Sequence, residues 1–116
     1  MDLKTIIALV SDDYTDKVIE RAREEGATGA TVITSGRGEG LKPSTTFLGL
    51  TLEGQVDMIL FIVEKHLSRT ILEAIGEVAD FDKKTGTGIA MQLNIEDAIG
   101  LESQMKTIKQ EIEDQI

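Results

Sequence analysis

The sequence predicts an α+β fold, in which an antiparallel sheet carries two helices on one face. Three observations lead to this prediction: short β-branched apolar segments suited to strands, two segments with the apolar spacing of helices, and their order along the chain. The chain has 116 residues and 41% hydrophobic content, which is enough for one modest core. We therefore treat residues 1–116 as a single domain, with the core of the fold at about residues 3–100.

The first part of the chain is predicted to form a strand, a helix and a second strand. Residues 5–10 are a short β-branched apolar run, typical of a strand buried on both faces, and the polar residues 11–13 suit the start of a helix. The helix is predicted over residues 13–25, because apolar side chains recur there every four residues and Gly26 suits its C-cap. Residues 29–34 then have strand composition.

A loop and two further strands are predicted next. Residues 35–44 contain three glycines and a proline, and we expect a loop that leaves the body of the fold there. Residues 45–52 have strand composition, and residues 56–63 form a nearly unbroken apolar run suited to a central strand. Because Glu53 and Gly54 form a tight-turn signal between the two segments, we expect them to pair as a hairpin.

The last part of the chain completes a known order of elements. An amphipathic helix is predicted over residues 65–78, a short strand over residues 89–93 and a terminal helix over residues 101–116. The terminal helix has an apolar stripe formed by Leu101, Met105, Ile108 and Ile112. The order strand, helix, strand, strand, helix, strand is the ferredoxin-like βαββαβ pattern. Two helices cannot cover both faces of such apolar strands, so we expect the bare face to meet other subunits in a homo-oligomer.

Composition argues against several classes of partner. A formal net charge of -9 argues against nucleic acid and anionic membrane surfaces, because both require a basic patch. The absence of cysteine excludes disulfides and thiolate metal sites. The sequence has no run of eighteen apolar residues, and Asp2 stands where a secretory signal carries basic residues. We expect a cytoplasmic protein without direct membrane insertion.

No residue pattern supports catalysis or a metal site. His66 is the single histidine and has no second ligand at a suitable spacing, so we assign it to the surface. The acids in residues 12–16 are explained by the first turn of a helix. No cysteine or Gly-x-Ser-x-Gly nucleophile is present, and an acylphosphatase-like arginine–asparagine pair would have only Asn94, far from Arg37 in the pattern. We predict a protein that is not an enzyme and binds no metal.

Two glycine-containing turns, at residues 34–40 and 85–88, carry the functional signal. Each turn taken alone is explained at least as well by positive φ angles in a surface loop as by a ligand. Together with their surroundings, however, they resemble the PII family of nitrogen regulatory signal proteins. The resembling segments are residues 26–32 (entry to the second strand), 36–38 (the turn that opens the T-loop), 58–75 (third strand and second helix) and 85–91 (B-loop and fourth strand).

The resemblance, which spans about residues 3–101, implies a homotrimer whose subunit clefts bind an adenine nucleotide, ATP, ADP or AMP, between the T-loop base and the B-loop. It also implies a regulated partner protein, such as a transporter or an enzyme, controlled through the loop at residues 35–44. A ligand cleft is then the better interpretation of the turns, because backbone N–H groups at glycines can cradle an anion. The residues so assigned to the nucleotide are Thr31, Gly36, Arg37, Gly38, Lys83, Lys84, Gly86, Thr87, Gly88 and Ile89.

The chain departs from the family pattern at the phosphate contacts. Ile89 stands in the place of the B-loop lysine, and Gly100 and Glu102 stand in the places of two arginines. Hydrogen bonds to charged groups contribute about 1.5 to 3 kcal/mol each, so three losses weaken triphosphate binding by several orders of magnitude. Arg37, Lys83 and Lys84 are the cations near the turns, and partial replacement of the missing contacts explains the two lysines no better than a solvated face does. The T-loop equivalent contains no tyrosine, which excludes its uridylylation.

Two alternatives stand beside a nucleotide sensor. The first is a trimeric adaptor without a nucleotide, in which the stripe of residues 101–116 recruits a partner helix and the cleft is vestigial. The second is a protein of the same fold that responds to a cyclic dinucleotide or a metal. The lost phosphate ligands favour the adaptor, and the resemblance across most of the chain favours the sensor.

Overall fold

The computed structural model describes residues 2–34, 44–47, 50–53, 55–84 and 86–100. Its elements are β1 (Leu3–Ser11), the 3-10 helix η1 (Asp12–Tyr14), α1 (Thr15–Glu24), β2 (Thr31–Thr34), β3 (Ser44–Phe47), β4 (Leu50–Glu53), β5 (Val56–Glu64), α2 (Lys65–Val78) and β6 (Gly88–Asn94). The terminal helix predicted over residues 101–116 lies outside the described residues. None of the helices in the described part of the chain is long and apolar enough to cross a membrane.

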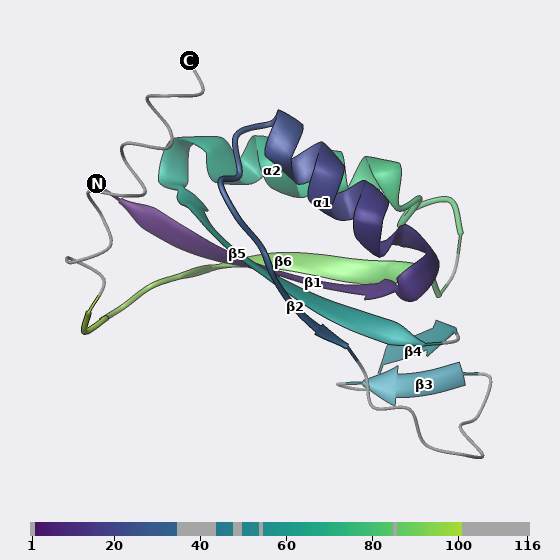
Figure 1. Ribbon diagram of the computed structural model, residues 1–116. Coiled ribbons are helices and arrows are strands. Elements are labelled where there is room, and N and C mark those ends of the chain that lie inside the picture. The colour runs from purple at the N-terminus through teal and green to yellow at the C-terminus, as the bar shows by residue number, and fades with distance from the viewer. Residues whose placement is uncertain (1, 35–43, 48–49, 54, 85, 101–116) are drawn as a thin grey trace.

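Four strands form the main sheet, in the order β2-β5-β1-β6, and every neighbouring pair is antiparallel. Helices α1 and α2 lie side by side on the same face of this sheet, as Figure 1 shows. This is the ferredoxin-like arrangement that the order of elements predicts, and the prediction of an α+β fold with both helices on one face is confirmed.

The core fills the space between the helices and the sheet. Because side chains alternate along a strand, every second residue of β1 and β5 points toward the helices. The strand residues of this face include Ile6, Ala8, Val10, Ile59 and Phe61, and all are buried. From the helices, Val18, Ala22, Ile71 and Ile75 close the layer without any exposed surface.

Both helices form where the apolar spacing predicts them. The second helix has the predicted bounds of residues 65–78. The first begins as the 3-10 turn η1 and continues as α1, and Gly26 after it has a φ of 112°, the left-handed conformation expected beyond a helix end.

The hairpin predicted between residues 45–52 and 56–63 is wrong. The first segment forms two strands, β3 and β4, which pair with each other in a separate two-stranded sheet. The second segment, β5, pairs with β1 and β2 instead. Strand composition indicates that a segment is extended, but it does not identify the partner, which is decided by contacts distant in sequence.

Candidate functional site

The first part of the predicted site is a groove on the sheet face that carries no helix. It has a volume of about 610 Å³ and is lined by Thr5, Thr28, Gly29, Ala30, Thr31, Leu60 and Ile62. We call it the Thr31 groove. Thr31 opens β2 and is the register partner of Leu60. The groove therefore combines threonine hydroxyl groups with aliphatic walls, and its volume is in the range of small-molecule sites.

The second part is the turn at Gly86, Thr87 and Gly88, which leads into β6. The two glycines have φ angles of 88° and 154°, in the region that favours glycine. The carbonyl oxygen of Thr87 accepts a hydrogen bond from the backbone N–H of Ser11 at 2.8 Å, which fixes the turn to the end of β1. This hydrogen bond ties the turn to the sheet at Ser11.

Packing alone accounts for the glycine at position 88. A β-carbon placed on Gly88 would lie 2.4 Å from the carbonyl oxygen of Leu9 and 2.7 Å from a ring carbon of Phe81. Both distances are shorter than atoms tolerate without displacement. Gly88 is therefore required for the approach of β6 to β1, whether or not a ligand binds at the turn.

The side chains around the turn divide between the two sides of the sheet. Ile89 packs with Leu9, Val56 and Met58 in a small apolar cluster on the helix-free side. Lys83 is exposed and lines a pocket along α2, whose lining also includes Arg69. Lys84 is exposed too. The apolar environment of Ile89 suits packing better than contact with phosphate.

The Thr31 groove and the Gly86–Gly88 turn do not meet within one chain. Thr31 belongs to β2, at one edge of the sheet, and the turn leads into β6 at the opposite edge, with β5 and β1 between them. Three strand spacings separate the edges by about 14 Å. Gly36, Arg37 and Gly38, the other residues assigned to the nucleotide, lie outside the described residues. Within one chain, the lining of the Thr31 groove does not include the Gly86–Gly88 turn.

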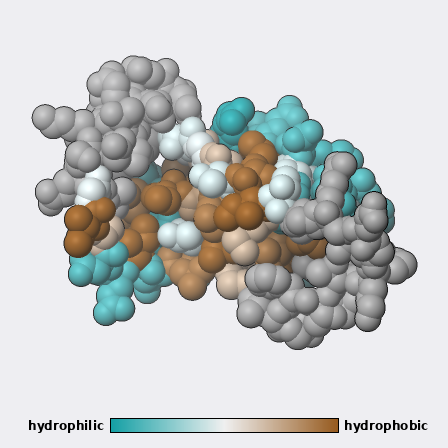
Figure 2. All heavy atoms as spheres, turned by 60° about the horizontal axis from the view of Figure 1, so that its bottom comes forward, coloured by the Kyte–Doolittle hydropathy of each residue, from teal (hydrophilic) through white to brown (hydrophobic). Residues whose placement is uncertain are grey.

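The helix-free face between the two edges is apolar. Figure 2 shows hydrophobic side chains gathered across the middle of this face. Ile33, Ile62 and Leu93, from three different strands, are 50%, 42% and 43% exposed. The two helices cover one face only, as the sequence leads us to expect, although residues 5–10 of β1 are buried or half-buried on both sides of the sheet. Contiguous exposed apolar surface on a protein of this size is typical of an interaction site.

Residues 3–105 match the family model of the nitrogen regulatory protein P-II. The chain belongs to this family. The resemblance found in the sequence is thereby confirmed, and so is the prediction that this PII protein is not an enzyme, since the family consists of regulatory proteins. No curated protein matches the chain.

Three solved structures share the fold of this PII protein. A PII-like signalling protein from Thermus thermophilus is 24% identical, with a TM-score of 0.57 over 82% of this chain and 91% of its own. CPII from Thiomonas intermedia, bound to ADP, AMP and acetate, is 18% identical, with a TM-score of 0.58 over 86% and 92%. The divalent ion tolerance protein CutA1 from Ehrlichia chaffeensis is 12% identical, with a TM-score of 0.60 over 97% and 94%.

One buried polar contact of this PII protein has little sign in the sequence. The hydroxyl of Thr15 donates a hydrogen bond to the carboxylate of Asp57 at 2.6 Å, and the two residues are only 7% and 8% exposed. One signal of this contact is present in the sequence, because Asp57 interrupts the apolar run of residues 56–63 near its start. Its partner, Thr15, is 42 residues away in the sequence, and the residues around Thr15 give no sign of the contact.

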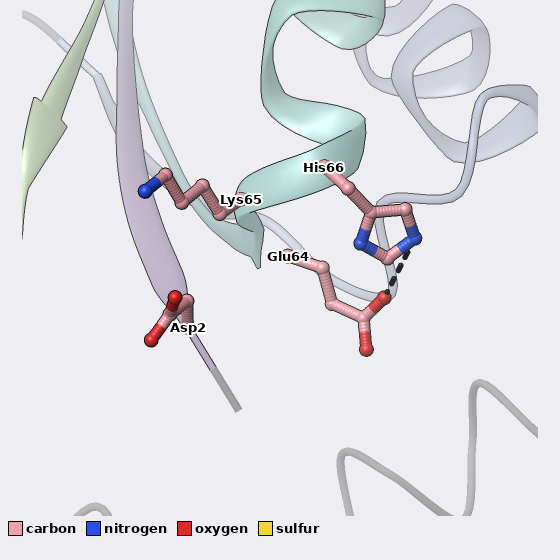
Figure 3. Close-up of a pocket in the computed structure, with 4 residues that line it drawn as sticks. All are labelled: Asp2, Glu64, Lys65 and His66. Carbon is pink, nitrogen blue, oxygen red and sulfur yellow. Dashed lines mark ion pairs between the residues drawn. The ribbon is translucent and has the colours of Figure 1, made fainter.

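The surroundings of His66 fit an ion pair at the surface, in which the Glu64 side chain is only 14% exposed. The pocket in Figure 3 is lined by Asp2, Glu64, Lys65 and His66, and the imidazole points toward the carboxylate of Glu64 with 3.3 Å between Nε2 and Oε2. His66 is largely exposed. Within the described residues, no group of three or more histidine, cysteine or acidic side chains gathers around a metal position.

Proposed function

We propose that this PII protein is a homotrimeric, cytoplasmic signalling protein that binds an adenine nucleotide between subunits. A partner protein, such as a membrane transporter or an enzyme, is then controlled through the loop at residues 35–44. One observation carries the proposal: the two parts of the candidate site lie at opposite edges of one sheet, and the face between them is exposed and apolar. Assembly through that face covers the apolar surface and brings an edge of one copy near the other edge of the next.

The chemistry of the two parts suits a nucleotide divided between subunits. The Thr31 groove offers hydroxyl groups that recognise the polar edge of a base and aliphatic walls that pack against its ring. The Gly86–Gly88 turn offers backbone N–H groups to a phosphate. The proposed ligand set is Thr31, Gly36, Arg37, Gly38, Lys83, Lys84, Gly86, Thr87, Gly88 and Ile89.

The phosphate end favours a nucleotide with fewer phosphates. Ile89 lies in an apolar cluster and supplies no charge to the turn. Each missing charged contact removes about 1.5 to 3 kcal/mol from phosphate binding, so we expect AMP or ADP to bind at least as tightly as ATP. CPII from Thiomonas intermedia, which shares the fold, was determined with ADP and AMP bound, and this supports the choice of ligand.

Calorimetric titration tests the proposal. The full chain is titrated with ATP, ADP, AMP, cyclic AMP, cyclic di-AMP and bicarbonate, with and without magnesium, and the mass in solution is measured by light scattering. Binding of AMP or ADP by a trimer supports the nucleotide sensor. A trimer that binds nothing in the panel supports the adaptor, and binding of cyclic di-AMP alone supports the cyclic-dinucleotide alternative. A monomer contradicts the intersubunit site.

The adaptor is favoured by one specific observation. The glycine at position 88 and the isoleucine at 89 both have packing roles that need no ligand. In that case the trimer recruits its partner through the apolar stripe of residues 101–116, without control by a nucleotide.

A further inference from the structure

The hydrogen bond between Thr15 and Asp57 lies where three segments of the chain meet. Thr15 is the first residue of α1, and Asp57 is the second residue of β5. In the sheet, Asp57 is the register partner of Val10 on one side and of Thr34 on the other. Thr34 is the last described residue before the segment that contains the loop at residues 35–44 and the strands β3 and β4.

Two backbone hydrogen bonds converge on the same corner. The N–H of Asp12 donates to the carbonyl oxygen of Gln55 at 2.9 Å, and the N–H of Ser11 donates to the carbonyl oxygen of Thr87 at 2.8 Å. Gln55 is the residue directly before β5, where the chain comes back from this segment to the main sheet. Thr87 is in the Gly86–Gly88 turn. Adjacent amide groups, on Ser11 and Asp12, therefore hold the proposed phosphate turn and the base of the proposed regulatory loop.

We infer that Asp57 is a positioning residue, which, through its hydrogen bond with Thr15, couples the Gly86–Gly88 turn to the base of the segment between Thr34 and Gln55. The contact fixes the beginning of α1 against β5, and Ser11 and Asp12 lie four and three residues before Thr15, at the start of the short 3-10 helix η1 that leads into α1. A shift at either the turn or the segment is then transmitted through this short stretch of chain. The functional meaning of the coupling rests on the proposed function, whereas the contact itself does not.

The chemistry of the pair suits positioning. A buried carboxylate is costly unless it accepts hydrogen bonds, and its cost rises when a donor is removed. Two apolar side chains of similar shape fill the same space without that cost. The pair therefore contributes a directional contact. The carboxylate is also favourably placed, because backbone N–H groups concentrate positive potential at the start of a helix.

Amide hydrogen exchange on the full chain without nucleotide tests the inference directly. Thr15→Val keeps the shape of the side chain and removes the hydroxyl. We expect the amides of Ser11 and Asp12 to exchange faster by a similar factor, about tenfold or more. The reason is that the variant loses the hydrogen bond to the Asp57 carboxylate, which on this inference holds both amides in position. Amides in the middle of α2, at Ile71 and Ile75, keep their wild-type rates.

Two further variants serve as controls. Asp57→Asn retains an oxygen that accepts the Thr15 hydroxyl, so its effect on both amides is smaller than that of Thr15→Val. Thr70→Val makes the same chemical change on an exposed position of α2 and leaves all four rates unchanged. The inference is overturned if Asp12 responds without Ser11, if neither responds, or if the α2 amides accelerate by the same factor, which identifies a general loss of stability.

Nucleotide is then added to separate the two proposals. With AMP or ADP at saturation, the wild-type chain is expected to show slower exchange at Ser11 and also at Asp12, although only Ser11 is bonded to the turn. In Thr15→Val the slowing persists at Ser11 and is lost at Asp12. If wild type responds to neither nucleotide while the ligand-free exchange results hold, the nucleotide proposal fails and the positional coupling stands. Equal slowing at Asp12 in both proteins overturns the coupling.

Discussion

Gly88 and Leu9 approach so closely that a β-carbon on Gly88 would lie 2.4 Å from the carbonyl oxygen of Leu9. The glycine also has a φ of 154°, which L side chains rarely adopt. Gly88→Ala must therefore displace β6 from β1 and strain the backbone. We expect it to lower the free energy of unfolding by about 2 to 4 kcal/mol, measured by urea denaturation at a fixed protein concentration.

Gly29→Ala is the matched control for Gly88→Ala. A β-carbon on Gly29 meets no atom within 4 Å, and its φ is not in the positive range. Alanine there is expected to leave stability unchanged or to raise it by up to about 1 kcal/mol, through the reduced freedom of the unfolded chain. Equal effects of the two substitutions would mean that Gly88 is not under steric constraint and would leave ligand binding as the explanation for the glycine.

Thr87 offers a test of the same turn that does not depend on steric contact. Its hydroxyl is buried and has no hydrogen-bond partner within the described residues. Since an unpaired buried hydroxyl costs about 1 to 3 kcal/mol, Thr87→Val is expected to stabilise the protein by about 1 kcal/mol or more. Thermal unfolding followed by circular dichroism measures the change. Thr87→Ser, which keeps the hydroxyl and loses a methyl group, is expected to destabilise, and stabilisation by both variants would refute the explanation.

Local patterns in the sequence predict the helices and the order of the fold. The apolar spacing predicts the second helix over residues 65–78, and the structure has those bounds, because five apolar residues at helical spacing create a face that only a helix can bury on the sheet. The position of Gly26 was equally predictable, since a left-handed residue beyond a helix end is a local requirement.

Contacts between distant segments explain the remaining differences. The composition of residues 45–52 is the same whether the segment pairs with itself or with β5, so the partner was not predictable. The steric role of Gly88 depends on Leu9, 79 positions earlier, and the role of Asp57 depends on Thr15. The resemblance implies a site between subunits, and within one chain the Thr31 groove and the Gly86–Gly88 turn lie at opposite edges of the sheet.

Thr31→Val tests the proposed base-recognition end of the cleft. Thr31 is exposed on β2 and lines the groove, and replacing its hydroxyl by a methyl group removes one hydrogen bond to the nucleotide without changing the size of the side chain. A hydrogen bond contributes about 1 kcal/mol, so the Kd for AMP is expected to rise about fivefold to tenfold. Thr34→Val, on the same strand but outside the groove, is the control. Equal Kd values for both variants would remove Thr31 from the site.

Ile62→Asp tests the role of the apolar face in assembly. Ile62 is 42% exposed on β5, on the side of the sheet away from the helices, so a polar side chain there is tolerated by the single chain. In a trimer that buries this face, the substitution places a carboxylate without a partner in an apolar interface, which costs several kcal/mol per site. We therefore expect the mass measured by light scattering to fall from three chains to one at micromolar concentration.

Thr70→Asp adds the same charge on the outer side of α2 and is expected to leave the trimer intact. If Ile62→Asp remains trimeric with unchanged circular dichroism, subunits associate through another surface, and the cleft between the Thr31 groove and the Gly86–Gly88 turn loses its structural basis.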